Sequence, residues 1–163
     1  MQVANFLVDG TLSVALAFGL LRVGHALTAV FIVLFGAGLL VSGLFVADPA
    51  LGYPKDAPQV TTIHGVVHQG AGLATFTFIS VAAFAAAARF ARERASGWRR
   101  YSLATGLLVV VLFVVGTVAQ VMDQRGVWPD APVGLLQRIA VFIGWGWLAL
   151  FSYRLWLRTG AKR

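Results

Sequence analysis

The side chains best suited to bind an ion or a ligand lie at helical spacing within apolar sequence. His64 and His68 form an H-x-x-x-H pair, and this spacing places two imidazoles on one helix face, about 6 Å apart along the axis. Two such nitrogens could bind one divalent metal ion, with a third ligand from Asp48, Asp56 or Asp123. The glutamate of a zinc-protease motif is absent, since the chain reads HGVVH. Structural histidines that hydrogen-bond to loop carbonyls or helix ends, and a proton-responsive pair, are the alternatives.

Other polar residues recur in the same halves of the expected helices. Ionised groups inside a bilayer cost about 2.5 to 3.5 kcal/mol at the helix centre and therefore turn toward partners or water. We therefore expect one shared polar pocket. Its candidate residues are Asp9, His64, His68, Gln120, Asp123, Gln137 and Arg138.

Arg138 is the cation of this group and keeps its proton at any ordinary pH. Its candidate acceptors are Asp9 and Asp123, and a short loop between the last two helices favours Asp123. Such an ion pair could simply hold helices in register. Alternatively, the planar guanidinium could bind a phosphate or carboxylate group of a ligand.

Several kinds of chemistry are disfavoured by the residues present. One b-type haem needs two axial histidines that face each other, which His64 and His68 on one helix cannot do, and His25 lies at the opposite end of its helix. The chain has no cysteine, which excludes disulfides, thiolate ligands and a cysteine nucleophile. Ser42 and Ser80 lack a base and an orienting acid at their depth, so a catalytic triad is not expected.

The elements that must position these residues are membrane-spanning helices. The 163 residues are 59% hydrophobic, with a mean hydropathy of +0.82 and 12% charged residues, a composition too apolar for a soluble domain. Five apolar stretches approach or exceed the roughly 20 residues that a spanning helix needs. We predict a single all-α integral membrane domain over residues 1–163, with helices at about 3–21, 26–46, 63–90, 101–121 and 134–156.

The basic residues predict how the bundle is oriented. Ten of the thirteen Lys and Arg flank the same helix ends, which by the positive-inside rule are cytoplasmic. An odd number of spans then puts the N-terminus outside and the C-terminus in the cytoplasm, in a multi-pass protein of the cell membrane. Membrane lipids, and not nucleic acid, are the expected partners of the +7 net charge. The ten residues are Arg22, Arg89, Arg92, Arg94, Arg99, Arg100, Arg154, Arg158, Lys162 and Arg163.

Several ordered segments resemble a known family. They are NFLVDGTLSVALAFGL, GLLVSGLFVADP, TTIHGVVHQGAG, GWRRYS and GLLQRIAVFIGWGW. Together they resemble an uncharacterised prokaryotic multi-span membrane family, domain of unknown function 998. The resemblance implies an all-helical membrane domain without an established activity. Members of that family usually have six spans, so this chain resembles a five-span member or one without its first span.

Three functions follow from these observations. The leading hypothesis is a non-enzymatic or accessory protein whose outward-facing polar pocket binds a lipid headgroup or a small anionic molecule, without a cofactor. A metal-dependent hydrolase of lipid or lipid-linked substrates, acting through His64 and His68, is the first alternative. The second alternative is a structural subunit of a larger membrane complex, and a homo-oligomer is compatible with each of the three.

Overall fold

The fold is an all-helical bundle in the computed structural model, which describes residues 2–50, 54, 56–58 and 60–160. Within these residues, five helices are long and apolar enough to cross a membrane, which confirms the predicted class. Lys162 and Arg163 of the basic set lie outside the described residues. The helices are α1 (Gln2–Arg22), α2 (Ala26–Leu44), α3 (Ile63–Arg92), α4 (Ser96–Gln124) and α5 (Val133–Gly160).

The last three helices extend beyond the stretches that hydropathy predicts. The fourth was expected from residue 101, but α4 begins at Ser96 and includes Arg99 and Arg100 in its first turns. Hydropathy marks only the apolar part of a spanning helix, whereas arginine is a good helix former and lies exposed in these turns. These three helices therefore continue past the segment that hydropathy identifies. By contrast, α2 ends at Leu44, two residues before the predicted end at 46.

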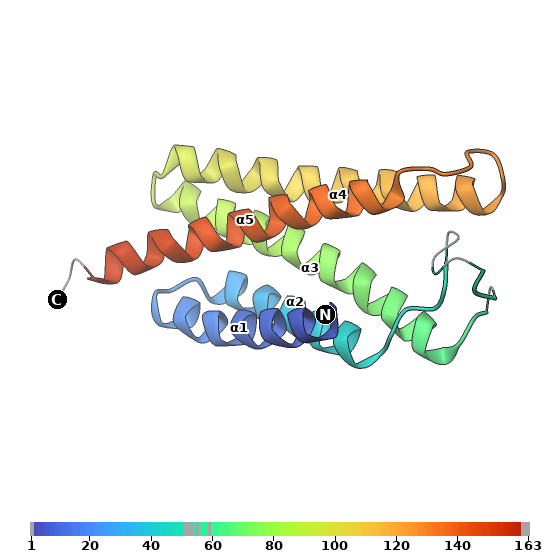
Figure 1. Ribbon diagram of the computed structural model, residues 1–163. Coiled ribbons are helices and arrows are strands. Elements are labelled where there is room, and N and C mark those ends of the chain that lie inside the picture. Colours follow the sequence, from blue (N-terminus) through green and yellow to red (C-terminus); the bar gives the residue numbers. More distant parts are fainter. Residues whose placement is uncertain (1, 51–53, 55, 59, 161–163) are drawn as a thin grey trace.

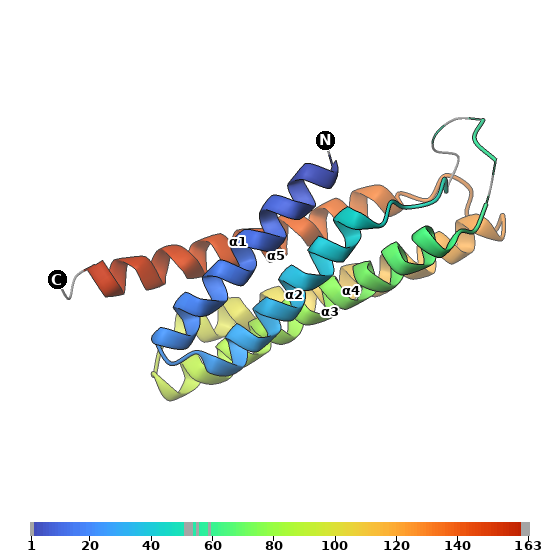
Figure 2. The same cartoon turned by 90° about the horizontal axis from the view of Figure 1, so that it is seen from below.

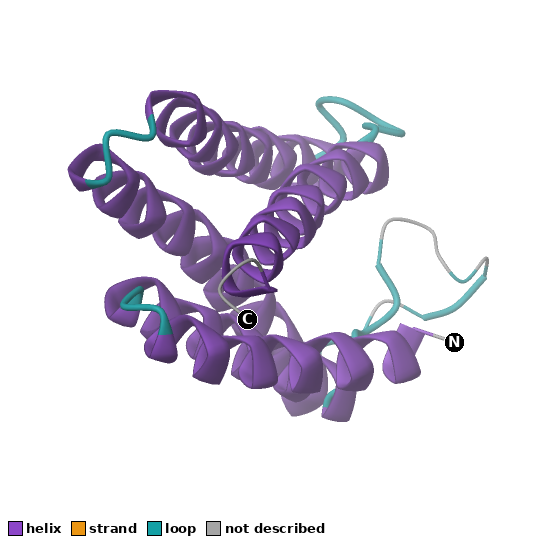
Figure 3. Cartoon of the chain, turned by 90° about the vertical axis from the view of Figure 1, so that its left-hand side faces the viewer, coloured by secondary structure: helices purple, strands orange, loops and turns teal. Residues whose placement is uncertain are grey.

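Each helix packs mainly against its neighbours in the chain. Figure 1 shows α1 and α2 as one pair, α4 and α5 as another, and α3 running diagonally between them. The end view in Figure 3 separates the two pairs, and Figure 2 shows α1 beside α2 from below. We call the end with the tight turns 23–25 and 93–95 the arginine-rich end, and the end with loops 45–62 and 125–132 the long-loop end.

The two tight turns at the arginine-rich end share one backbone geometry. The N–H of His25 donates to the carbonyl of Leu20, and that of Ala95 donates to Phe90, both at 2.9 Å. This hydrogen bond, from an N–H just after the helix back to a carbonyl five residues earlier, defines the Schellman motif. The motif requires a left-handed backbone at the residue that precedes the donor. Arg94 fills that position with φ 54°, where glycine would be easier. Both connections are therefore short and bring four helices together at this end.

The hydrophobic core lies where α5 crosses the other helices. Trp147 and Phe151 of α5 are fully buried and stack at 5.3 Å between ring centroids. Opposite them, α3 contributes an alanine-rich face, whose small side chains let helices approach closely in a membrane. Its buried alanines are Ala82, Ala83, Ala86 and Ala87.

The contact between α1 and α2 depends on two glycines. A Cβ atom on Gly10 would lie 2.8 Å from the carbonyl oxygen of Gly36. Gly10→Ala should therefore lower the free energy of unfolding by about 1 to 3 kcal/mol, the usual cost of overpacking. Chemical unfolding in detergent measures this change. Gly19→Ala is the control on the same helix, because its Cβ would meet nothing within 4 Å; equal stability of both variants would contradict this helix contact.

Candidate functional site

At the long-loop end, Asp48 fixes the start of α3. Its carboxylate accepts the backbone N–H of Thr62 at 2.7 Å and the hydroxyl of Thr62 at 2.6 Å. The same hydroxyl oxygen accepts the N–H of Gly65 at 3.1 Å and so caps the helix. A Cβ atom on Gly65 would overlap the carboxylate of Asp48. These hydrogen bonds, first from the Thr62 side chain and then from its backbone, lower the pKa of Asp48.

The two histidines of the H-x-x-x-H pair have different surroundings. Nδ1 of His68 lies 2.8 Å from the carbonyl oxygen of Phe45 and 3.1 Å from that of Ser42. Because both partners are acceptors, Nδ1 carries the proton and donates to carbonyls that the end of α2 leaves free. His64 is exposed and packs its ring against Phe45 at 5.2 Å between centroids. These contacts are those expected of a structural histidine that hydrogen-bonds to a helix end.

The acidic residues of the predicted pocket bind separate partners. Asp9, half-buried on α1, accepts the indole N–H of Trp145 at 3.3 Å and so links α1 to α5. Asp123 accepts the backbone N–H of Asp130 at 3.0 Å within its own loop. The structure therefore assigns one carboxylate to helix packing and the other to loop conformation.

Arg138 and Gln137 are both exposed on α5, and Gln120 is half-buried on α4. Across the described residues, no ion pair joins Arg138 to Asp9 or to Asp123. The expected ion pair with Asp123 is therefore not formed, because that carboxylate binds the α4–α5 loop. The guanidinium lies near the start of α5 with its charge uncompensated by an acid of the described chain.

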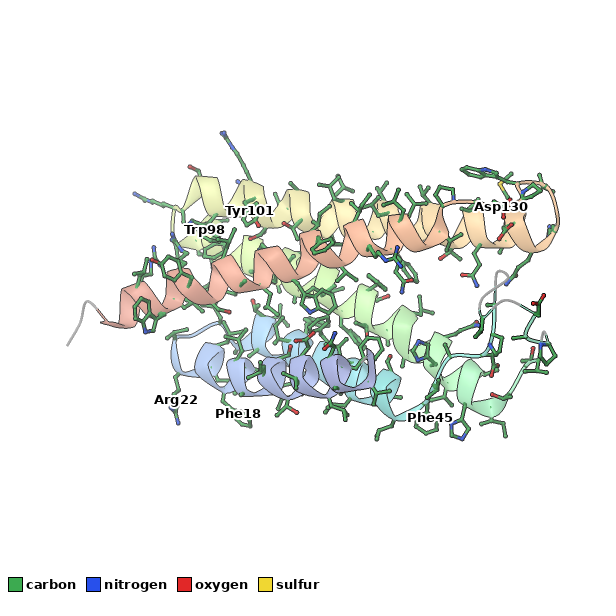
Figure 4. The ribbon with its side chains drawn as sticks, in the orientation of Figure 1. Phe18, Arg22, Phe45, Trp98, Tyr101 and Asp130 are labelled. Atoms are coloured by element: carbon green, nitrogen blue, oxygen red, sulfur yellow. The ribbon has the colours of Figure 1, made fainter. Side chains whose placement is uncertain are left out.

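A polar recess of about 260 Å³ opens at the long-loop end, between the α2–α3 loop, the first turns of α3 and the end of α4. Four of its lining residues have polar side chains, namely Asp48, Thr61, Gln69 and Gln124. We call these four residues and the space between them the polar recess. Of the sequence-predicted site residues, only Asp48 lines it. Figure 4 shows Phe45 and Asp130 at this end, with Trp98, Tyr101 and Arg22 at the other.

A metal site is not formed by the predicted ligands. Within the described residues, no group of three or more His, Asp or Glu side chains could hold a metal ion. His68 directs Nδ1 toward backbone carbonyls, and each oxygen of Asp48 accepts one hydrogen bond from Thr62. Within the described residues, His64, His68 and Asp48 are therefore not grouped as a metal site.

The most connected charged cluster lies instead at the arginine-rich end. Glu93, at the end of α3, accepts Nε–H of Arg89 at 3.0 Å and Nη1–H of Arg158 of α5 at 3.1 Å. Nε2 of His25, in the α1–α2 turn, lies 3.6 Å from the same carboxylate. We call these four residues the Glu93 cluster. It joins the α1–α2 turn, α3 and α5.

His25 is the buried member of the Glu93 cluster. The residue is 3% exposed, and its ring packs edge-on against Phe90 and Phe151 at 5.7 and 5.3 Å. Its Nδ1 is buried and has no hydrogen-bond partner in the part of the chain that the structure describes. An imidazole in this position gains most from apolar packing, which favours its neutral form.

Stability should fall in mild acid because of His25. Burial lowers the pKa of His25 below its ordinary 6.5, which Glu93 opposes and Arg89, Arg158 and Arg154 reinforce. The unfolded chain thus binds a proton more readily, so the stabilisation present above pH 6.5 is lost as the pH falls through the folded-state pKa. In thermal unfolding in detergent, the Tm should be constant from pH 7.5 to about 6.5 and should decrease from there to pH 5.

His25→Gln should remove most of this pH dependence, because the amide does not titrate in this range. His64→Gln, which changes an exposed histidine, should leave the pH dependence as in the parent protein. A parent Tm that is constant from pH 7.5 to 5 would contradict the assignment to His25.

One feature of the sequence indicates part of the Glu93 cluster, in addition to the membrane orientation that the arginines predict. The positive-inside pattern accounts for the arginines at the helix ends but not for Glu93, which is the only acid between residues 57 and 122. Its i,i+4 spacing from Arg89 indicates a helical ion pair. The contribution of His25 could not be predicted, since it depends on how the two turns meet.

The comparisons with known proteins give one match. A family model described as protein of unknown function (DUF998) matches residues 1–154, which include α1 to α4 and most of α5. No curated protein and no solved structure matches the chain.

Proposed function

The chain belongs to the DUF998 family of proteins of unknown function, and we propose that it is a non-enzymatic membrane protein whose polar recess binds a lipid headgroup. The observation that carries the proposal is the lining of the recess, where a carboxylate, a hydroxyl and two amides from separate segments meet beside apolar side chains. Lipid headgroups offer polar groups at the level of helix ends, and their chains can lie along the exposed apolar faces of the bundle.

The recess favours a headgroup that donates hydrogen bonds. Asp48 has a lowered pKa and is therefore ionised at neutral pH, and the carbonyl oxygens of Gln69 and Gln124 accept hydrogen bonds. A primary amine, as in phosphatidylethanolamine, supplies three donors and a positive charge. The exposed Arg138 suits a lipid phosphate, because a guanidinium binds phosphate through paired hydrogen bonds. The sequence suggested that the pocket binds an anionic group. We propose instead that the recess binds the amine of a headgroup.

The proposed orientation follows from charge. With the arginine-rich end in the cytoplasm, the recess and the start of α1 face outward, and the end of α5 faces inward. We propose this orientation for a multi-pass protein of the cell membrane.

Native mass spectrometry of the detergent-purified protein tests lipid binding. Phosphatidylethanolamine should bind more tightly than phosphatidylcholine, whose methylated amine has no N–H donor. Gln69→Leu combined with Gln124→Leu should weaken phosphatidylethanolamine binding about tenfold, which corresponds to about 1.4 kcal/mol for two lost hydrogen bonds. The binding of phosphatidylcholine should change little.

Gln137→Leu serves as the control, because Gln137 is an exposed glutamine outside the recess. Equal binding of the two lipids by the parent protein, or equal losses in the control and the double variant, would overturn the proposal.

A further inference from the structure

A second hollow lies at the arginine-rich end, away from the polar recess. It is a shallow groove of about 360 Å³ between the first turns of α4 and the later part of α5. Its lining is almost entirely apolar and consists of Gly97, Trp98, Tyr101 and Leu150. A Cβ atom on Gly97 would meet nothing within 4 Å, so the groove is open at this glycine. We call it the α4–α5 groove.

Cationic groups border the polar end of this groove. The guanidinium of Arg154, one helical turn beyond Leu150 on α5, lies over the ring of Trp98 at 5.0 Å and over that of Phe90 at 5.3 Å. Its Nε atom is buried and has no hydrogen-bond partner among the described residues. The nearby carboxylate of Glu93 accepts hydrogen bonds from two other arginines, so Arg154 retains donors for an anion.

The first turn of α4 adds a second source of positive potential. The residue before this helix, Ala95, has no side chain that can cap it, and the first turn contains no acidic residue. The free N–H groups of a helix start carry partial positive charge. Arg99 and Arg100 follow, both exposed. An apolar groove that ends in unpaired cationic donors complements a molecule with an anionic head and an apolar tail.

We propose that the α4–α5 groove binds an anionic phospholipid from the leaflet at the arginine-rich end. Its phosphate contacts the Arg154 guanidinium and the start of α4, while an acyl chain follows Tyr101 and Leu150. Trp98 and Tyr101 lie at the depth where aromatic rings meet headgroups. This site is independent of the polar recess, since the two lie at opposite ends of the bundle and have lining of opposite polarity.

The test is native mass spectrometry of the full chain with phosphatidylglycerol and with phosphatidylcholine. Phosphatidylglycerol should bind to the parent protein at least tenfold more tightly than phosphatidylcholine. Arg154→Gln should reduce its binding about tenfold. Gly97→Leu, which fills the groove without changing any charge, should do the same and keeps the test valid if Arg154→Gln does not fold.

Arg22→Gln is the charge-matched control, because Arg22 is an exposed arginine at the same end and outside the groove. It should change phosphatidylglycerol binding less than twofold. Equal losses in Arg22→Gln and Arg154→Gln, or normal binding by Gly97→Leu, would overturn the proposal in favour of diffuse charge attraction. Full displacement of the lipid by millimolar inorganic phosphate would also overturn it, since the groove would then bind phosphate alone.

Discussion

Glu93→Gln is expected to lower the free energy of unfolding by about 2 kcal/mol. Removing one partner of a buried ion pair costs about 3 to 5 kcal/mol. The expected loss is smaller here because Glu93 is 21% exposed and its partners Arg89 and Arg158 are 40% and 52% exposed, so that water screens both pairs. The variant removes the negative charge and leaves a single acceptor oxygen where Arg89 and Arg158 each had one. Equilibrium unfolding in detergent at pH 7.5 gives the value.

Asp56→Asn is the matched control for Glu93→Gln. It changes the net charge by the same amount, and Asp56 is an exposed loop residue with a left-handed backbone, φ 63°, that asparagine also tolerates. The control should remain within about 0.5 kcal/mol of the parent protein. Two variants of equal stability would show that the Glu93 cluster does not hold the bundle together.

Trp147→Ala is expected to have the largest effect on stability, a loss of about 3 to 5 kcal/mol. Trp147 is fully buried, stacks on Phe151 and donates its indole N–H to the hydroxyl of Ser102 at 2.9 Å. Its removal leaves a cavity where α4 and α5 meet. The measurement is again equilibrium unfolding, with helix content followed by circular dichroism.

Trp147→Phe separates packing from hydrogen bonding. It keeps an aromatic ring but loses the bond to Ser102, which should cost about 1 kcal/mol, since hydrogen bonds between membrane helices average about 0.6 kcal/mol. Trp128→Ala, in the exposed α4–α5 loop, should have little effect. A Trp147→Ala variant as stable as Trp128→Ala would be incompatible with the described core.

The helices could be predicted from sequence because a bilayer imposes a minimum length of apolar residues on each span. Their ends could not, because helices continue into polar sequence, as α4 does at Arg99 and Arg100. The tight turns could not be predicted either, because Arg94 adopts a left-handed conformation that its residue type does not favour. Local hydropathy therefore predicts the fold class, but it does not predict the helix ends or the contacts between helices.

Sequence reasoning and the structure group the polar residues differently. Asp48 does line the polar recess, but the sequence also grouped Asp9 with Asp123, and the structure gives them different partners, Trp145 and the Asp130 backbone. Helical spacing shows which residues share a face, yet it does not show which neighbouring helix that face meets. Long-range contacts such as that between Asp9 and Trp145 depend on packing, which no short motif encodes.

Single-cysteine labelling tests most directly whether the polar recess faces outward. The chain has no cysteine of its own, so a membrane-impermeant maleimide reports only on the residue introduced. Thr61→Cys lies in the recess, and Ser96→Cys lies exposed at the arginine-rich end. In intact cells that express the protein, Thr61→Cys should be labelled at once, and Ser96→Cys only after permeabilisation. The reverse pattern would place the recess in the cytoplasm and contradict the proposed function.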